Sequence, residues 1–245
     1  MGAVARVTRR SARRVQSDAL VVRSVAYGEA DVIATLLTEE EGKVAAIVRG
    51  ARRGSRRVAG ALEPMHTIRV LYEDKGTDLV TLKEAHVVRA RAGLLGRLEA
   101  LEAAGAALRW ARHVCPPRTP EPAVWASLAE LLDSLDREGA VADAQTELAV
   151  FGLKLLGDVG WGIELERCVV CGRPCPEDAA ATVDAQRGGI VCRACGGART
   201  RLSAAVRRAA IEGARGGDRA LVAPQAHALV ELVDSAMAAH TGFER

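Results

Sequence analysis

Cysteine is the residue type in this chain whose spacing points most directly to chemistry. The sequence of 245 residues contains six cysteines, and four of them form two Cys-x-x-Cys pairs, CVVCG at 168–172 and CRACG at 192–196. Two intervening residues let both sulfurs of a tight turn face one ion, and the glycine that follows permits the backbone to turn around it. The spacing therefore predicts one structural zinc ion per chain, bound by Cys168, Cys171, Cys192 and Cys195.

The four-thiolate set also indicates what the metal would do. Four thiolates complete a tetrahedron and leave no position for a catalytic water. The intervening segment is poor in apolar residues, so we expect the metal to supply its folding free energy, on the order of 10 kcal/mol or more. A redox motif or two disulfides are the alternatives, but a redox Cys-x-x-Cys normally occurs once, beside a βαβ pattern that this sequence lacks. Cys175 is predicted to be a bystander, and Cys115 a buried thiol near a helix end.

Arginine is the second residue type whose distribution suggests a function. Residues 49–57 read RGARRGSRR, in which five of nine residues are arginine and none is acidic. A second basic cluster spans Arg6 to Arg14, and residues 1–83 carry a net charge of +5 whereas the remaining residues carry −2. A solvated loop is the ordinary role of such a run, but basicity this local also suggests a surface that attracts polyanions.

The elements that would position the arginines are short β-strands. Between residues 18 and 88, five runs rich in β-branched residues are separated by turn signals such as GEA, EEG and DKGTD. Five short strands in about seventy residues favour a small barrel, and an OB-fold is the common five-stranded solution. The arginine run follows the third strand, and we expect it to be the longest connection of this domain and a mobile one.

The elements around the cysteines are predicted to be helices. Over residues 89–164 the apolar residues adopt helical spacing, as in the series Leu94, Leu98, Leu101 and Leu108, and CPPRTPEP at 115–122 separates the first helix from the second. After a zinc-binding segment at 165–198, residues 203–213 and 224–240 again predict helices. We expect this C-terminal part, residues 199–245, to pack on the helical domain, because neither set of helices closes a core alone.

The predicted fold class is therefore α+β and multidomain. A five-stranded OB-like β-barrel comes first, a helical bundle follows, and a four-cysteine zinc finger is inserted into the helical part. Residues 1–17 are predicted to be a flexible basic tail. They are rich in arginine and serine, as in an organellar transit peptide, but they lack the apolar core of a secretory signal, and we expect a cytoplasmic protein.

Nothing in the sequence predicts catalysis. The five histidines are scattered and none has a metalloprotease spacing, and the phosphate loop GxxxxGK[ST] of ATPases is absent. No uninterrupted apolar run approaches the ~18 residues that a membrane helix needs. We therefore expect a protein that is not an enzyme.

Three stretches resemble a known family. Residues 19–53 (ALVVRSVAYGEADVIATLLTEEEGKVAAIVRGARR), the LEP at 62–64 and residues 151–172 (FGLKLLGDVGWGIELERCVVCG) are similar to the bacterial DNA repair and recombination mediator family RecO. The similarity runs in order from about residue 18 to residue 240. It implies a non-enzymatic, nucleoid-associated protein of the RecFOR pathway that binds single- and double-stranded DNA and anneals complementary strands after DNA damage. The implied partners are RecR, RecF, single-strand DNA-binding protein and RecA, which the family helps to load.

The resemblance also implies which residues contact DNA. The family carries a basic loop in its OB domain, which here corresponds to Arg49, Arg52, Arg53, Arg56 and Arg57. Separately from the resemblance, which begins at about residue 18, the basic cluster before it offers additional candidate contacts, namely Arg9, Arg10, Arg13 and Arg14. The barrel offers few stacking groups, chiefly Tyr27 and Tyr72, so ion pairing to phosphates must dominate binding, with little sequence preference.

Two other classes of protein share part of this pattern. A zinc-ribbon and OB-fold factor acting in transcription or on RNA would also have the barrel and the zinc, and it would fail to anneal DNA. A metal-dependent nuclease would need an open coordination position and surrounding carboxylates, which the closed cysteine set argues against.

Overall fold

The computed structural model describes residues 12–53, 60–137, 143–215 and 223–242. The chain forms two compact units. The first combines the chain up to Ala90 with Pro116–Glu121, and the second contains Arg91–Cys115 and the chain from Pro122 onward. The cysteine-rich segment at 165–198 is thus part of the same unit as the helices rather than a separate one.

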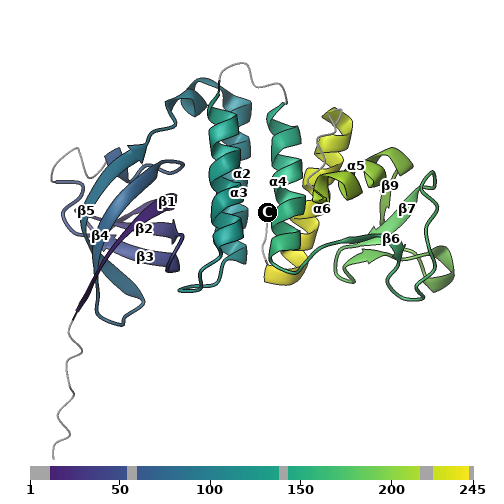
Figure 1. The fold of residues 1–245 in the computed structure, drawn as a ribbon, viewed down its shortest axis with the longest axis horizontal. Coiled ribbons are helices and arrows are strands. Elements are labelled where there is room, and N and C mark those ends of the chain that lie inside the picture. The colour runs from purple at the N-terminus through teal and green to yellow at the C-terminus, as the bar shows by residue number, and fades with distance from the viewer. Residues whose placement is uncertain (1–11, 54–59, 138–142, 216–222, 243–245) are drawn as a thin grey trace, which may run out of the picture. The chain divides into compact units, whose positions relative to one another are not determined.

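The first unit is built around a closed five-stranded barrel (Figure 1). Its strands are β1 (Arg13–Tyr27), β2 (Asp31–Thr38), β3 (Gly42–Val48), β4 (Thr67–Asp74) and β5 (Leu79–Arg89). They close in the order β1-β2-β3-β5-β4, and the β3–β5 pair is parallel whereas the other pairs are antiparallel. The OB-like barrel that the five β-branched runs predict is therefore present.

Alternation along the strands produces the barrel interior. In β3 every second residue is buried, with Val44, Ala46 and Val48 facing inward. Tyr72 of β4 is completely buried in the same core, and burial, together with the charge of Glu41, raises the pKa of its phenol to about 12. Tyr72 is therefore a core residue and cannot stack on a base, which removes one of the two expected stacking groups.

The N-terminal strand begins earlier than the sequence suggests. Arg13–Ser17 belong to β1 and pair with β4, with Arg13 opposite Asp74. The predicted flexible tail of residues 1–17 was therefore wrong for its last five residues. The side chains of Arg13 and Arg14 form ion pairs with Glu41 at 2.7 Å and with Glu73 at 3.7 Å. Arg9 and Arg10 lie outside the described residues.

A short segment between two helices returns to the barrel. The backbone N–H of Arg118 donates to the carbonyl of Lys43 at 3.0 Å, and its guanidinium contacts Asp74 at 2.6 Å. Burial raises the pKa of Asp74, but the hydrogen bonds from Arg118 and the N–H of Gly76 outweigh it and hold that pKa below its usual value. Gly42 has φ +67°, and a Cβ there would lie 1.9 Å from the carbonyl oxygen of Thr119, so only glycine admits this segment.

The second unit is organised around one central helix. It contains the 3₁₀ turn η1 (Ala92–Gly96) and the helices α2 (Leu98–Val114), α3 (Pro122–Asp136), α4 (Ala144–Asp158), α5 (Ala204–Ala214) and α6 (Ala223–Thr241). The helix α4 packs against α2, α3, α5 and, most extensively, α6 (Figure 1). A Cβ at Gly152 would lie 2.8 Å from the ring of Trp110 and 2.9 Å from Val233, so the helices meet here without room for a methyl group. None of the helices in the described ranges is long and apolar enough to cross a membrane.

Alanine, rather than leucine, provides most of the buried face of α2. Ala100, Ala103, Ala104, Ala107 and Ala111 are all buried on this helix. Leu98, which belongs to the predicted leucine stripe, is 69% exposed instead. The helical period and the burial of Leu94 and Leu108 were predicted correctly, whereas Leu101 is half-buried and the prediction was wrong for Leu98.

A small four-stranded sheet follows α4. Its strands are β6 (Glu164–Cys168), β7 (Ala181–Asp184), β8 (Gly189–Ile190) and β9 (Thr200–Leu202), in the order β6-β8-β7-β9. Val183, Ile190, Val191 and Leu202 are buried in it. The segment that is poor in apolar residues therefore still contains a small buried core, and the expected contribution of a metal to its folding stays a prediction.

Candidate metal centre and nucleic-acid interface

The four cysteines of the two Cys-x-x-Cys pairs form one cluster. The sulfurs of Cys168, Cys171, Cys192 and Cys195 all lie within 4.8 Å of one another, and Sγ of Cys171 is 3.8 Å from Sγ of Cys192. The first pair starts at the end of β6 and the second follows β8, and these two strands are neighbours in the sheet, with Cys168 opposite Ile190. The parallel pairing of β6 and β8 thus brings both pairs to one place.

Glycines close the two Cys-x-x-Cys turns. The N–H of Gly172 donates to the carbonyl of Cys168 at 2.8 Å, and Gly172 has φ +74°. In the second turn the N–H of Cys195 donates to the carbonyl of Cys192 at 2.9 Å, and Gly196 follows with φ +100°. These left-handed conformations are the backbone turn that the glycine after each pair predicts.

The four sulfurs differ in their electrostatic environment. Backbone N–H groups of Cys192 and Cys171 lower the pKa of Cys168 to about 6. Hydrogen bonds that the Cys195 thiol donates to the sulfurs of Cys192 and Cys171 raise its pKa to about 12. A divalent cation among the four sulfurs would favour the thiolate form of each, and an all-sulfur tetrahedral donor set suits a soft ion such as zinc.

The two remaining cysteines lie apart from the cluster. Cys115 is buried at the C-terminal end of α2, as predicted. The four-cysteine cluster does not include Cys175, whose N–H donates to the carbonyl of Glu166 at 2.8 Å. None of the six cysteines forms a disulfide bond, which disfavours the alternative of two disulfides.

A buried arginine on α5 holds the segment next to the cluster. The guanidinium of Arg207 is 1% exposed and donates to the carbonyl oxygens of Leu165 at 2.9 Å, Cys175 at 3.4 Å and Pro176. These carbonyls lie three residues before and four and five residues after the first Cys-x-x-Cys pair. Sequence reasoning missed this residue, because RRAA in a helical pattern looks like a solvated face.

Three of the five arginines in RGARRGSRR lie on a fixed turn. Arg49, Arg52 and Arg53 are exposed, and Arg56 and Arg57 lie outside the described residues. The N–H of Gly50 donates to the Asp31 carboxylate at 2.8 Å, and the N–H of Arg52 donates to the carbonyl of Ala30 at 2.9 Å. The expected mobile connection is thus tied, in its first half, to the turn between β1 and β2.

That neighbouring turn adds an aromatic ring and an acid. Tyr27, at the end of β1, is 54% exposed and lies opposite Asp31 in the register. Arg53 forms an ion pair with Glu29 at 2.7 Å, but both side chains are largely exposed, so the pair is weak and can exchange for another anion. The arrangement presents positive charge and one stacking group at the same end of the barrel.

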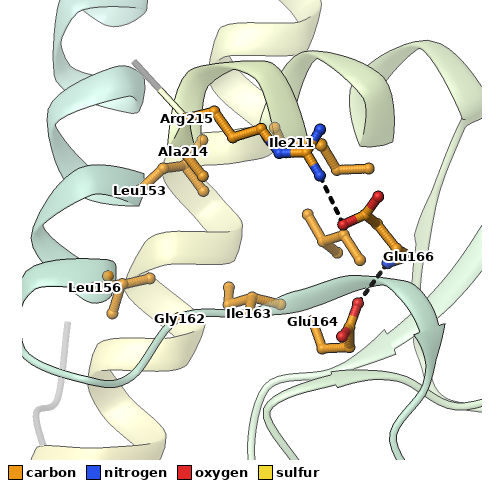
Figure 2. Close-up of a pocket in the computed structure, with 12 residues that line it drawn as sticks. Leu153, Leu156, Gly162, Ile163, Glu164, Glu166, Ile211, Ala214 and Arg215 are labelled. Carbon is orange, nitrogen blue, oxygen red and sulfur yellow. Dashed lines mark hydrogen bonds and ion pairs between the residues drawn. The ribbon is translucent and has the colours of Figure 1, made fainter. Parts of the chain in front are cut away.

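The helical unit also contains a cavity, drawn in Figure 2. It lies beside α4, α5 and β6, with Leu156, Ile163 and Ile211 among its apolar lining. Glu166, also in its lining, forms an ion pair with Arg215 at 2.9 Å. No motif of the sequence points to this cavity.

Comparison with known proteins identifies the family. The family model for the N-terminal region of recombination protein O matches residues 12–91, and the model for its C-terminal region matches residues 95–240. The chain belongs to the RecO family. As a RecO-family member it has a role in DNA repair. The two matched ranges confirm that the resemblance covers nearly the whole sequence.

Individual RecO proteins are similar over most of their length. The chain is 35% identical to the DNA repair protein RecO of Anaeromyxobacter sp. (strain Fw109-5) over 183 residues, which cover 74% of this chain and 70% of that protein. It is 36% identical to the protein of the same name from Myxococcus xanthus over 202 residues, 82% of this chain and 80% of the relative. The corresponding protein of Rubrobacter xylanophilus is 34% identical over 74% of this chain and 71% of its own.

Proposed function

We propose that this chain is a non-enzymatic mediator that binds single- and double-stranded DNA through its barrel and anneals complementary strands. With RecR, and with RecF where it takes part, it would help to load RecA onto DNA coated by single-strand DNA-binding protein. The observation that carries the DNA-binding part is the fixed turn that presents Arg49, Arg52 and Arg53 beside the exposed ring of Tyr27. Family membership supports the choice of DNA repair as the process.

The chemistry of the turn suits phosphate rather than base recognition. Each guanidinium can donate two parallel hydrogen bonds to one phosphate, and such contacts carry no sequence information. One exposed aromatic ring contributes about 1–3 kcal/mol of stacking at most, which is not enough to dominate the binding of a polyanion. Annealing needs no covalent step, because positive charge between two strands reduces their repulsion while the bases find partners.

We propose that the four-cysteine cluster holds one structural zinc ion. Cys168, Cys171, Cys192 and Cys195 would supply four thiolates, and zinc would add folding free energy to the small sheet. Four thiolates leave no position for water, so the site would not activate a nucleophile. The metal would therefore stabilise the fold of the second unit and would take no part in a reaction.

A salt titration tests the arginine turn. The triple variant Arg49→Ala, Arg52→Ala and Arg53→Ala should bind oligonucleotides of two different compositions equally weakly. It should flatten the log–log salt dependence by up to about 2, since each lost contact to a single strand is worth about 0.7. Arg69→Ala is the matched control, because Arg69 is an exposed barrel arginine whose guanidinium already pairs with Asp18 at 2.8 Å.

A strand-annealing assay, with and without single-strand DNA-binding protein, tests the activity itself. Annealing by the triple variant should fall more than its binding, because two strands must be neutralised together. If the triple variant kept both the salt dependence of binding and full annealing, the arginine turn would be an ordinary solvated loop. Wild-type protein that binds structured RNA but does not anneal DNA would instead support the transcription or RNA alternative.

A further inference from the structure

We propose that a cavity beside the cysteine cluster binds a phosphate group of single-stranded DNA, so that the small sheet provides a DNA contact separate from the barrel. The proposal rests on the proposed function, DNA binding, and assigns part of it to the second unit. The cavity has a volume of about 380 Å³ and lies among the two cysteine turns and strands β7, β8 and β9.

Apart from the cysteines, every ionisable side chain in the cavity lining is an arginine. Arg173, Arg193 and Arg201 are among its fourteen lining residues, and none of the fourteen is Asp or Glu. Arg173 follows Gly172 of the first turn, Arg193 lies within the second turn, and Arg201 lies on β9 opposite Thr182. Three parts of the segment, separate in sequence, therefore bring arginine to one cavity.

These three guanidinium groups are available to an external anion. All three residues are exposed, and in the ranges that the structure describes no ion pair or side-chain hydrogen bond involves their guanidinium groups. Guanidinium forks match the geometry of phosphate oxygens and bind them in pairs. A phosphate that enters the cavity could thus accept hydrogen bonds from these guanidinium groups without displacing an existing partner.

The carboxylates of the same segment are mostly engaged elsewhere. Asp184 pairs with Arg187 at 3.5 Å, Glu166 pairs with Arg215 at 2.9 Å, and the Glu164 carboxylate accepts the N–H of Glu166 at 2.7 Å. Glu177 and Asp178 are exposed in the loop beside the cavity but do not line it. The cavity of Figure 2, which Glu164 and Glu166 line, lacks this one-sided charge.

The remaining lining explains the choice of a single strand. Pro174, Pro176, Ile190 and Val191 give the cavity an apolar part next to its charges. An unpaired nucleotide can place a sugar or base edge against such a surface while its phosphate meets the arginines, whereas a duplex keeps its bases stacked inside. Single-stranded DNA should therefore gain more from this site than duplex DNA does.

The same arginines have a rival role. Zinc with four thiolates carries a formal charge of about −2 by the usual ligand count, and Cys168 and Cys192 both line the cavity. Arginines that only balanced this charge would matter for metal retention and not for DNA. Loss of the arginines would lower the zinc content if they only balance this charge, and would reduce the salt dependence of DNA binding if they bind phosphate.

The test uses the full-length, zinc-loaded chain and a labelled single-stranded oligonucleotide. The triple variant Arg173→Gln, Arg193→Gln and Arg201→Gln should retain zinc and flatten the log–log salt dependence by up to about 2. Arg187→Gln is the matched control, because Arg187 is an exposed arginine of the same segment that already pairs with Asp184. Hydrogen exchange should show protection of residues 173–182 when DNA binds to the wild type and not to the triple variant.

Each outcome decides the proposal. Wild-type binding with an unchanged slope in the triple variant would overturn the inference and leave the proposed function intact, whether or not that variant loses zinc. Failure of the wild type to bind DNA would overturn the proposed function and this site with it. If the triple variant does not fold, the single variant Arg201→Gln replaces it, because Arg201 lies outside both cysteine turns. This variant should flatten the log–log salt dependence of DNA binding by about 0.7, and an unchanged salt dependence would reject the site.

Discussion

Replacing Arg207 with methionine should weaken the attachment of the metal-binding segment to the helical unit. The change keeps most of the apolar contact of the side chain but removes every hydrogen bond to the carbonyls of Leu165, Cys175 and Pro176. Hydrogen bonds from a charged donor contribute roughly 1.5–3 kcal/mol each, and a buried carbonyl left without a partner costs about 1–3 kcal/mol.

Two effects reduce that loss. A buried guanidinium is expensive to remove from water, so the methionine variant is relieved of that cost. The Nε–H of Arg207 is also buried without a hydrogen-bond partner in the described part of the chain, so the native arrangement is already imperfect. We therefore expect a net loss of about 2–4 kcal/mol in the free energy of unfolding, rather than the sum of three strong bonds.

Urea unfolding of the zinc-loaded chain measures the loss, and the rate of zinc transfer to a coloured chelator measures its local effect. Arg208→Met is the control, because Arg208 is the next residue of α5 and is exposed. Arg207→Met should shift the urea midpoint and speed metal release, and Arg208→Met should do neither. Equal midpoints and equal release rates for the two variants would refute the reasoning.

Three further predictions concern the metal, the helical core and the barrel core. Cys168→Ser should abolish binding of one zinc per chain and unfold residues 165–198 while leaving the DNA affinity of the barrel largely intact; metal analysis that finds no zinc in the wild type would contradict this. Phe151→Ala should lower the free energy of unfolding in urea by about 3–5 kcal/mol, because Phe151 is buried on α4. If the variant kept its full stability but lost partner binding, α4 would be an interface helix instead. In a Tyr27→Phe variant, where Tyr72 is the remaining tyrosine, phenolate absorbance should rise only near pH 12. The neutral phenol contributes its full share of stability below pH 10.0, and this contribution is lost as the pH rises toward about 12. Phenolate absorbance that rises near pH 10.0 in the folded protein would show that the ring is not buried.

The sequence predicts best where a local pattern determines the structure. Alternating β-branched residues specify the barrel strands, and the two Cys-x-x-Cys pairs with their glycines specify the turns of the cluster, because in both cases neighbouring residues carry the information. Both predictions are met by β1–β5 and by the four clustered sulfurs.

Prediction fails where a residue's role depends on distant partners. Arg207 looks like a solvated helix residue, and only the folded chain brings three carbonyls of another segment to it. Asp31 looks like an ordinary turn acid, yet it fixes the arginine turn through Gly50. The alanines of α2 form a packed face because α4 lies close to them, as Gly152 against Trp110 shows, and a pattern based on leucine cannot reveal this.

The return of Pro116–Glu121 to the first unit means that the barrel is not a contiguous module of the chain. The polypeptide leaves this unit after Ala90, comes back for six residues and leaves again at Pro122. A fragment that stops at Ala90 would lose Arg118, the ion-pair partner of Asp74. It would also lose the close backbone contact between Gly42 and Thr119. A protease cut near Ala90 would separate the five barrel strands covalently from the second unit, but residues 116–121, which stay joined to that unit, would still contact the barrel. Transplanting or isolating the barrel therefore requires either the whole chain or a designed link that carries Arg118 back to β4.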